Sequence, residues 1–566
     1  MNLRFTTILL TLCSFCAPLK SQNVPKDFFS NPMEIPLILS GSFAELRSNH
    51  FHSGLDIKTQ QREGIAIYAP ADGYVSRIKV AHYGYGKALY LKHPNGYSTV
   101  YAHLSNYAGE IQKYVKSNQY NKESYVIELF PESELLAVKK GDLIGYSGNS
   151  GSSGGPHLHF EIRDAASRPM NPMLFGIEIP DTKKPLINSV IAYPLSDDAR
   201  INESSKPIKL RLIAQKDGSY KTEKVYAVGS IGFGISSYDQ QDGASNKNGL
   251  YNIKTTINGV EKLEVAFERF SFDETRYLNQ YIDYGYWKNN KSRVQRLFVA
   301  PNNPLSIFKN QDESGTLTVS PGFSSVFNIV AADFKGNAIN INIPIEGKTP
   351  ATTAKKASTE GLDFVSAVET NAITKGKFSI FMPANSLYED AYLDIKAVGD
   401  TLHLHKDEIP IHKNITISVD ASNYHEKIRE KLFIGELNYK GDPYYNKTYR
   451  KGSKLSIRTR SFGSYTLVAD LESPSIVPRN FENGKWISNN NTLEIEIEDA
   501  LSGIGSYRAT INGKFILMEY NYKKDVLTYD FDDQVNLDAE NNLKLIVLDN
   551  VGNSATFEAT FFRKQS

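Results

Sequence analysis

One stretch of the chain holds four histidines and one aspartate that could together bind a metal ion and transfer protons. These residues are His52, Asp56, His103, His157 and His159. Zinc accepts imidazole nitrogen and carboxylate oxygen, and a catalytic zinc ion needs three protein ligands and one position open to water. Two histidines then remain to accept and donate protons near neutral pH, as a hydrolase requires. The set therefore predicts a metal site with its own catalytic bases.

The second pair of histidines lies in a predicted strand. Apolar and polar residues alternate through His157, Leu158, His159 and Phe160, which is typical of a β-strand. Successive side chains of a strand point to opposite faces. We therefore expect both imidazoles on one face of the strand, with Leu158 and Phe160 facing the core.

Glycines shape the rest of the site. His52 and Asp56 are four residues apart, so they could share one side of a helical turn or of a strand, and Gly54 between them disfavours the helix. A second glycine-rich stretch, residues 141–155, permits tight turns and close approach of the backbone. We expect this loop to form one wall of a substrate groove.

The strand that would carry His103 follows a predicted hairpin turn at residues 94–96, Pro-Asn-Gly. Its alternation places Tyr97, Thr99, Tyr101 and His103 on one face, which would direct His103 into a polar cleft.

Five motifs in this stretch resemble those of the lysostaphin-like (LytM-type) zinc endopeptidases, which cut peptide bridges in bacterial peptidoglycan. In chain order they are His52-x-x-x-Asp56, Ala69-Pro-Ala-Asp-Gly73, Tyr101-Ala-His103-Leu104, Gly141-Asp-Leu-Ile-Gly145 and Gly155-Pro-His157-Leu-His159. The resemblance covers roughly a quarter of the chain, and the ordered combination is specific. It implies that His52, Asp56 and His159 bind zinc and that His103 and His157 form the catalytic pair.

One feature departs from the family. Between Leu104 and Lys139 lie 34 residues, which is longer than the usual connection. A short helix is expected within 107–121 and a strand within 124–130, and long connections near sites often act as lids. The group that stabilises the oxyanion is not assigned by the motifs, and Arg47 and Tyr101 are candidates by their proximity in sequence only.

Length and composition bound the remaining possibilities. The 566 residues suggest several domains, and 64 basic against 63 acidic residues argue against nucleic acid as the partner. The 33 tyrosines and 29 phenylalanines favour strands. Residues 1–21 have the pattern of a signal peptide and include both cysteines, Cys13 and Cys16, and no later stretch reaches membrane-spanning length. We expect an exported chain in the periplasm or cell envelope, or secreted.

The expected fold is mostly β. An antiparallel-sheet peptidase domain at 22–180 would precede an enlarged immunoglobulin-like β-sandwich at 181–348, a linker at 349–361, a β-rich module at 362–471 and a second immunoglobulin-like sandwich at 472–566. The two sandwiches share an internal repeat: Asp181 and Pro185 match Asp470 and Pro474, and the Asp-x-x-Gly-Asn segment at 333–337 matches that at 549–553. This segment could bind calcium, although a structural turn is the favoured interpretation.

A further pair of histidines, His403 and His405, repeats the spacing of the active motif. No second His-x-x-x-Asp or Tyr-Ala-His motif accompanies it in the sequence. We interpret this pair as part of an exposed strand face without metal.

Three functions remain open. The first is a zinc endopeptidase acting on peptidoglycan cross-links during wall remodelling or lysis. The second is a catalytically silent envelope scaffold that binds or activates another wall hydrolase. The third and weaker alternative is a secreted protease for ordinary proteins.

Overall fold

The computed structural model describes residues 24–351, 358–531 and 539–564. Strands dominate these ranges and their sheets are antiparallel with few exceptions, which confirms the predicted fold class. No helix among the described residues is long and apolar enough to cross a membrane. The predicted signal peptide and residues 352–357 of the predicted linker lie outside the described residues.

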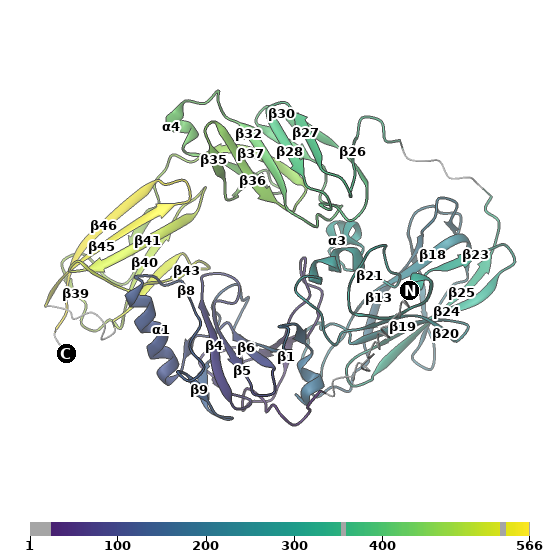
Figure 1. Cartoon of the computed structure of the whole chain (residues 1–566), viewed down its shortest axis with the longest axis horizontal. Helices are drawn as coiled ribbons and strands as arrows, with labels where there is room; N and C mark the ends of the chain where they lie inside the picture. Colours follow the sequence, from purple (N-terminus) through teal and green to yellow (C-terminus); the bar gives the residue numbers. More distant parts are fainter. Residues whose placement is uncertain (1–23, 352–357, 532–538, 565–566) are drawn as a thin grey trace, which may run out of the picture.

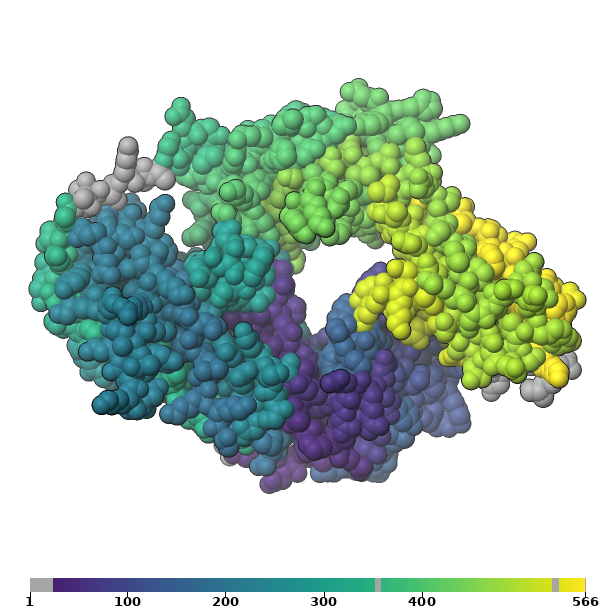
Figure 2. All heavy atoms as spheres, turned by 180° about the vertical axis from the view of Figure 1, so that it is seen from behind, coloured from purple at the N-terminus to yellow at the C-terminus, as the bar shows by residue number. Residues whose placement is uncertain are grey.

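The chain is arranged as a ring (Figures 1 and 2). The N-terminal sheets, purple in Figure 1, are followed by three β-rich regions, and the C-terminal region returns beside helix α1 (Gly109–Asn121). Figure 2 shows an opening through the centre of this ring.

The N-terminal region contains a nine-stranded sheet that carries most of the predicted site. Its strands, in spatial order, are β1 (Leu39–Gly41), β2 (Leu55–Lys58), β11 (His157–Arg163), β6 (Ser98–Ala102), β5 (Lys87–Lys92), β4 (Gly73–Val80) and β8 (Ile127–Leu129), with β12 (Pro169–Met170) beside β11 and β9 (Ala137–Val138) beside β4. A three-stranded sheet joins β3 (Ala66–Tyr68), β10 (Leu143–Tyr146) and β7 (Asn106–Tyr107), and the 3-10 helix η1 (Pro172–Phe175) closes the region.

The long connection after Leu104 contains the expected helix and strand. Helix α1 buries Ile111 and Val115, and β8 pairs with β4 at the end of the sheet opposite β2. This insertion therefore extends the sheet at its far edge, and it does not cover the strands that carry the histidines.

A large sheet follows between residues 186 and 347. Its thirteen strands are β13 (Leu186–Pro194), β14 (Arg200–Ile201), β15 (Ile208–Leu210), β16 (Leu212–Ala214), β17 (Tyr220–Thr222), β18 (Val225–Tyr238), β19 (Asn252–Ile257), β20 (Val260–Ala266), β21 (Gln295–Arg296), β22 (Phe308–Gln311), β23 (Leu317–Val319), β24 (Ser324–Ala332) and β25 (Ala338–Gly347). Short helices lie at η2 (Thr275–Tyr277), α2 (Leu278–Tyr281), α3 (Tyr284–Asn290) and η3 (Asp312–Gly315). The immunoglobulin-like architecture of this module stays a prediction.

Apolar side chains of the N-terminal region and of this large sheet form one continuous core. At the junction, the ring of Phe43 lies 5.3 Å from that of Phe270, and Phe51 lies 6.2 Å from Phe267, measured between ring centroids. The two regions that the sequence divides at residue 181 are therefore packed as one hydrophobic unit.

The third region has its own core and three sheets. The sheets contain β26 (Asp363–Val365) with β29 (Ala391–Leu393); β27 (Asn371–Lys375), β28 (Phe378–Met382), β32 (Ile415–Asp420), β36 (Lys454–Thr459) and β35 (Tyr449–Lys451); and β30 (Ile395–Val398), β31 (Thr401–Leu404), β37 (Gly463–Ala469), β33 (Leu432–Leu437) and β34 (Pro443–Tyr445). Its one helix among the described residues is α4 (Glu426–Arg429).

The C-terminal region has a separate core between two sheets. They contain β38 (Ser475–Pro478), β40 (Thr492–Glu498), β44 (Val526–Asp530) and β43 (Glu519–Asn521), and β39 (Lys485–Trp486), β46 (Ser554–Phe562), β45 (Glu540–Asp549), β41 (Ile504–Ile511) and β42 (Lys514–Phe515). Polar contacts to the N-terminal region close the ring: Lys87 pairs with Glu519 at 2.8 Å, and Lys523 donates to the carbonyl of Asn149 at 2.8 Å.

Candidate metal centre

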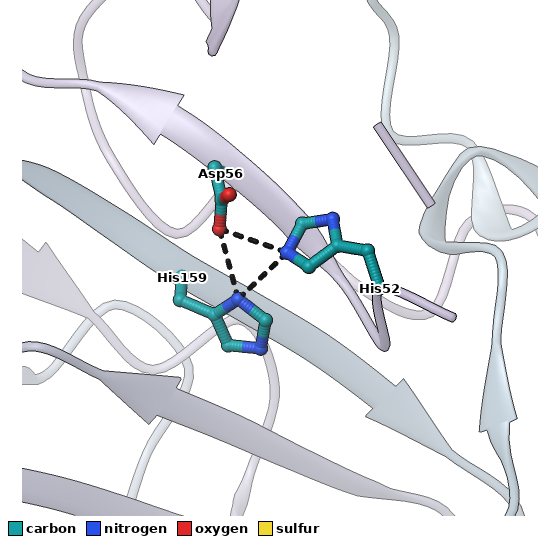
Figure 3. A group of neighbouring side chains, drawn as sticks. All are labelled: His52, Asp56 and His159. Carbon is teal, nitrogen blue, oxygen red and sulfur yellow. Dashed lines mark hydrogen bonds and ion pairs between the residues drawn. The ribbon is translucent and has the colours of Figure 1, made fainter. Parts of the chain in front are cut away.

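Three of the predicted site residues converge on one point (Figure 3). Asp56 on β2 and His159 on β11 are directly opposite each other in an antiparallel pair, and His52 lies in the turn before β2. His52 Nε2 lies 2.9 Å from Asp56 Oδ1 and 3.0 Å from His159 Nδ1, and His159 Nδ1 lies 2.9 Å from Asp56 Oδ1. The predicted ligand set is therefore assembled from two strands and one turn.

Gly54 makes the turn between the first two ligands possible. A Cβ atom at this position would lie 2.3 Å from the carbonyl oxygen of Phe160, closer than real contacts allow. Only glycine lets the backbone pass this near to β11. The helix-disfavouring residue noted in the sequence is thus the one that brings His52 and Asp56 against His159.

The outer nitrogens of both ligand histidines are held by acceptors. His52 Nδ1 lies 2.7 Å from the carbonyl oxygen of Ser42, and His159 Nε2 lies 2.8 Å from Glu161 Oε1. A ring nitrogen that donates a proton to such an acceptor leaves the other nitrogen with a free lone pair. His52 Nε2 and His159 Nδ1 can then face a cation, together with the carboxylate of Asp56. Two imidazole nitrogens and one carboxylate oxygen suit zinc, and the residues present fit this ion.

Buried negative charge favours a cation here. Glu161 is fully buried, and burial would raise its pKa, but Arg163 and His159 hold that pKa far below its usual range. Burial would likewise lower the pKa of His159, but its hydrogen bonds to Asp56 and Glu161 raise the pKa to about 9. The two carboxylates therefore attract positive charge to the point where the ligand atoms meet.

The two remaining histidines lie beside this group. The rings of His103 and His157 are 4.8 Å apart between centroids, and His157 Nε2 lies 3.4 Å from Asp56 Oδ1. His103 Nδ1 is 2.9 Å from the carbonyl of Ser150, and His157 Nδ1 is 2.8 Å from that of Gly155. Each ring is thus oriented through Nδ1 by a carbonyl of the glycine-rich loop, and the Nε2 of His157 lies beside the Asp56 carboxylate.

A groove lies beside the centre and reaches it at Asp56 and His157. It has a volume of about 740 Å³ and is lined by Arg47, Asp56, Lys58 and the loop 154–157. This volume lies within the range of small-ligand sites and can hold part of a peptide. The expectation that the glycine-rich loop forms one wall of a groove agrees with this lining.

The predicted alternation fails at His103. His159 is opposite Ala102 on β6, so the metal-facing side of this strand carries Ala102, and Tyr101 faces the core opposite Phe160. His103 reaches the site because its backbone has φ 60°, a left-handed conformation that ends the strand. Tyr101 and His103 therefore do not share a face, contrary to the prediction.

The structure distinguishes the two residues proposed to stabilise the oxyanion, Tyr101 and Arg47. Tyr101 is fully buried, and its hydroxyl lies 2.9 Å from Thr99 Oγ1, away from the groove. Arg47 lines the groove and donates to Asp56 Oδ2 at 3.1 Å. Tyr101 is thus excluded from the groove, and Arg47 remains the candidate.

The sequence interpretation did not assign Glu161 a role, although its signal was present. Glu161 follows His159 by two residues on β11, so the same alternation that pairs the histidines places it on their face. Ser53 Oγ also donates to Glu161 at 2.7 Å, and Tyr85 donates a short hydrogen bond to it. The acceptor role of Ser42 carries no sequence signal because it belongs to the backbone.

The pair His403 and His405 makes ordinary polar contacts on one strand and the residue after it. His403 is exposed on β31 and its Nδ1 lies 2.9 Å from Ser464 Oγ, while His405 Nδ1 accepts from the backbone N–H of Asp394. Neither residue belongs to a potential ligand group among the described residues.

The fold and the converging ligands define a metallopeptidase type of centre. Residues 50–120 and 133–172 match the family model described as peptidase family M23, so this part of the chain is a LytM-type M23 domain. Residues 363–470 match a second model, described as a Zu5-like domain.

Curated relatives match the same part of the chain. An "Uncharacterized metalloprotease" of Haemophilus influenzae is 33% identical over 28% of this chain and 27% of its own length. The "DD-carboxypeptidase/endopeptidase Mpg" of Neisseria meningitidis is 32% identical over 24% of this chain and 25% of its own. The "Peptidoglycan DD-endopeptidase ShyA" of Vibrio cholerae is 32% identical over 22% and 23%. The chain therefore spans only about a quarter of the length of each relative.

Solved structures match this part as well. The catalytic domain of lysostaphin from Staphylococcus simulans aligns with a TM-score of 0.18 and 23% identity over 24% of this chain and 90% of that one. The catalytic domain of the M23 protein EnpA from Enterococcus faecalis aligns with a TM-score of 0.20 and 22% identity over 26% and 98%.

Proposed function

We propose that this chain is a zinc-dependent endopeptidase that hydrolyses peptide cross-links of bacterial peptidoglycan. The observation that supports the proposal is the complete constellation: three ligand side chains meet at one point, two further histidines lie beside them, and one of these, His157, lines a groove. A silent scaffold would have no need of such a set.

The chain's residues divide the work. His52, Asp56 and His159 would hold zinc, which when bound supplies a water of lowered pKa and polarises a carbonyl. The Nδ1 atoms of His103 and His157 are held by carbonyls, and the Nε2 of His157 lies beside Asp56, so these two rings could take a proton from water and return one to the leaving amine. Arg47, which lines the groove, would stabilise negative charge there.

The names of the relatives support a particular bond. Two of them are named as DD-endopeptidases or DD-carboxypeptidase/endopeptidases. We extend this specificity to the present chain as a proposal, which favours a cross-link between D-alanine and a diamino acid over a glycine bridge. Export to the periplasm or cell envelope belongs to the same proposal, because the substrate lies there and residues 1–21 have the pattern of a signal peptide.

The test is a digest of purified, cross-linked muropeptides by the zinc-loaded chain, followed by mass spectrometry. We expect one water to be added per cleaved cross-link, cleavage of the D-alanine to diamino acid type, and no products from His159→Ala. If the zinc-loaded wild type cleaves neither type of cross-link, the proposed function is wrong and the scaffold alternative is favoured.

A further inference from the structure

A group of three carboxylates lies at the junction between the M23 domain and the large sheet. Asp181 belongs to the connection between the two regions, Asp239 follows β18, and Asp333 follows β24. One carboxylate oxygen of each lies within 4.8 Å of one from each of the others. Two ligands on opposite sides of a calcium ion, at about 2.4 Å each, are separated by about this distance.

A fourth side chain beside these carboxylates is buried and has no partner. Asn248 is 4% exposed, and neither its Oδ1 nor its Nδ2 has a hydrogen-bond partner among the described residues; the same holds for Oδ1 of Asp239, also 4% exposed. Such groups are costly to bury without a partner. The arrangement therefore indicates that something polar belongs between them.

The backbone fixes the side chain of Asn248 next to Asp239. The two residues form an antiparallel bridge, with N–H to carbonyl distances of 2.9 and 2.8 Å in the two directions. Residues that exchange both hydrogen bonds lie directly opposite, so their side chains project from the same face. The amide of Asn248 and the carboxylate of Asp239 are thus neighbours on one face.

These groups surround one small cavity. Asp181, Asp239, Gln241 and Asn248 all line a cavity of about 30 Å³. This is enough room for a single water molecule or ion and too little for an organic ligand.

Hydrogen bonds reach two members of the group, from Asn337 to Asp333 and from the backbone N–H of Lys183 to Asp181, but no ion pair offsets its charge among the described residues. No lysine or arginine among the described residues forms an ion pair with any of the three aspartates, although Lys335 lines the cavity. Burial, together with the charges of Asp181 and Asp333, raises the pKa of Asp239 to about 7. The nearby carboxylate of Asp242 adds to the negative field at Asp181.

We propose that Asp181, Asp239, Asp333 and Asn248 bind one calcium ion. All four ligand atoms would be oxygens, whereas zinc prefers nitrogen and sulfur ligands. Calcium accepts six to eight oxygens in flexible geometry. Magnesium would demand near-octahedral geometry with several waters, for which this cavity has little room.

An ion bound in this cavity would lie next to the segment that holds one of the predicted zinc ligands. The same cavity is lined by Ser42, whose carbonyl holds His52 Nδ1 and whose Oγ accepts from the backbone of Gly249. Gln241 beside Asp239 also accepts from the N–H of Leu39 on β1. Calcium bound here would fix the segment that orients one of the zinc ligands.

The C-terminal region offers a matched control. Its carboxylates Asp470, Asp499 and Asp549 also lie within 4.8 Å of one another, and Asp470 and Asp549 occupy the repeat positions of Asp181 and Asp333. Backbone N–H groups of Leu501 and Gly503 already satisfy Asp499 Oδ1. No buried side chain without a partner lines this second group among the described residues, so it is not part of the proposal.

The experiment titrates calcium chloride into the full-length, metal-free chain and into the zinc-loaded chain at pH 7.5, by calorimetry and thermal unfolding. We expect one calcium per chain and a rise in melting temperature that saturates below about 10 mM, which is about ten times the weakest dissociation constants of extracellular calcium modules, about 1 mM. Asp239→Asn should abolish both, and Asp499→Asn should leave both unchanged.

A further measurement distinguishes a role of these residues in calcium binding from a purely structural role. Because Asp239→Asn removes a repelling charge, it should raise the melting temperature without calcium while abolishing the calcium response. Asn248→Ala, which keeps all carboxylates, should weaken the response, and it replaces Asp239→Asn if that variant does not fold. An absent calcium response in wild type, a full response in Asp239→Asn, or a response lost only in Asp499→Asn would overturn the proposal.

Discussion

Replacing Glu161 tests whether the zinc centre depends on an oriented imidazole. Glu161 Oε1 lies 2.8 Å from His159 Nε2, and the carboxylate is fully buried, so its charge acts at short range without water between. Glutamine keeps a carbonyl oxygen that can accept from Nε2–H but removes the charge. Groups that orient a metal-bound histidine typically contribute a factor of about 10–100 in metal affinity. We therefore expect Glu161→Gln to weaken zinc binding about 10-fold, which is about 1.4 kcal/mol.

Removing the hydrogen bond as well should cost more. Glu161→Ala deletes both the charge and the acceptor, so we expect the upper part of the range, about 100-fold. The assay is competition for zinc against a chelating dye, with a thermal unfolding curve for each variant. Asp164→Asn is the matched control, because Asp164 is similarly buried and pairs with Arg168 at 2.7 Å but does not contact a metal ligand. Equal zinc affinity in wild type and both Glu161 variants would refute the reasoning.

Three further predictions concern catalysis, the ring and pH. His159→Ala should lose zinc and activity, whereas His157→Ala should keep zinc in metal analysis and lose a factor of about 10²–10⁴ in muropeptide turnover; reversed zinc contents would contradict the assignment. Tyr522→Phe combined with Lys523→Ala removes contacts to the loop at 149–151, and should lower turnover without changing zinc content; unchanged turnover would mean that the contact only closes the ring. The folded-state pKa of Asp239, about 7, exceeds its ordinary value, so the calcium-free chain should lose stability as pH rises through 7. Calcium should therefore raise the melting temperature more at pH 8 than at pH 5.5, where protons compete with the ion for the carboxylates. An equal rise at both pH values would contradict this.

The sequence predicted the site where it follows regular strand geometry. His157 and His159 share a face because β11 pairs on both sides, with β2 and with β6, which keeps its alternation regular. The same rule failed one strand away, because His103 adopts a left-handed backbone that spacing does not indicate. The motif resemblance assigns His103 to the catalytic pair, and the structure brings its ring beside that of His157. The strand periodicity instead puts His103 on the same face as Tyr101, which is wrong.

Residue spacing cannot predict which side chains from distant parts of the sequence meet in the fold. Asp181 and Asp333 belong to the sequence repeat, but Asp239 and Asn248 have no motif, and only the fold brings the three carboxylates together and places Asp181, Asp239 and Asn248 on one cavity. The sequence also predicts a domain boundary at residue 181. Side chains on both sides of it share a continuous core, which composition alone does not show.

The M23 domain is therefore oriented by its neighbours at two points. The carbonyl of Ser42 holds His52, and the Oγ of Ser42 accepts from Gly249 of the large sheet at 2.9 Å. The carbonyl of Ser150 holds His103, and the preceding carbonyl, that of Asn149, accepts from Lys523 of the C-terminal region at 2.8 Å. One predicted zinc ligand and one predicted catalytic histidine are thus each held by a carbonyl in a segment that another region of the chain contacts. Since the domain also shares its core with the large sheet, excising residues 22–180 would expose apolar surface and remove both supports. We therefore expect the site to keep its geometry in the full chain, where the large sheet and the C-terminal region contact the segments that hold His52 and His103.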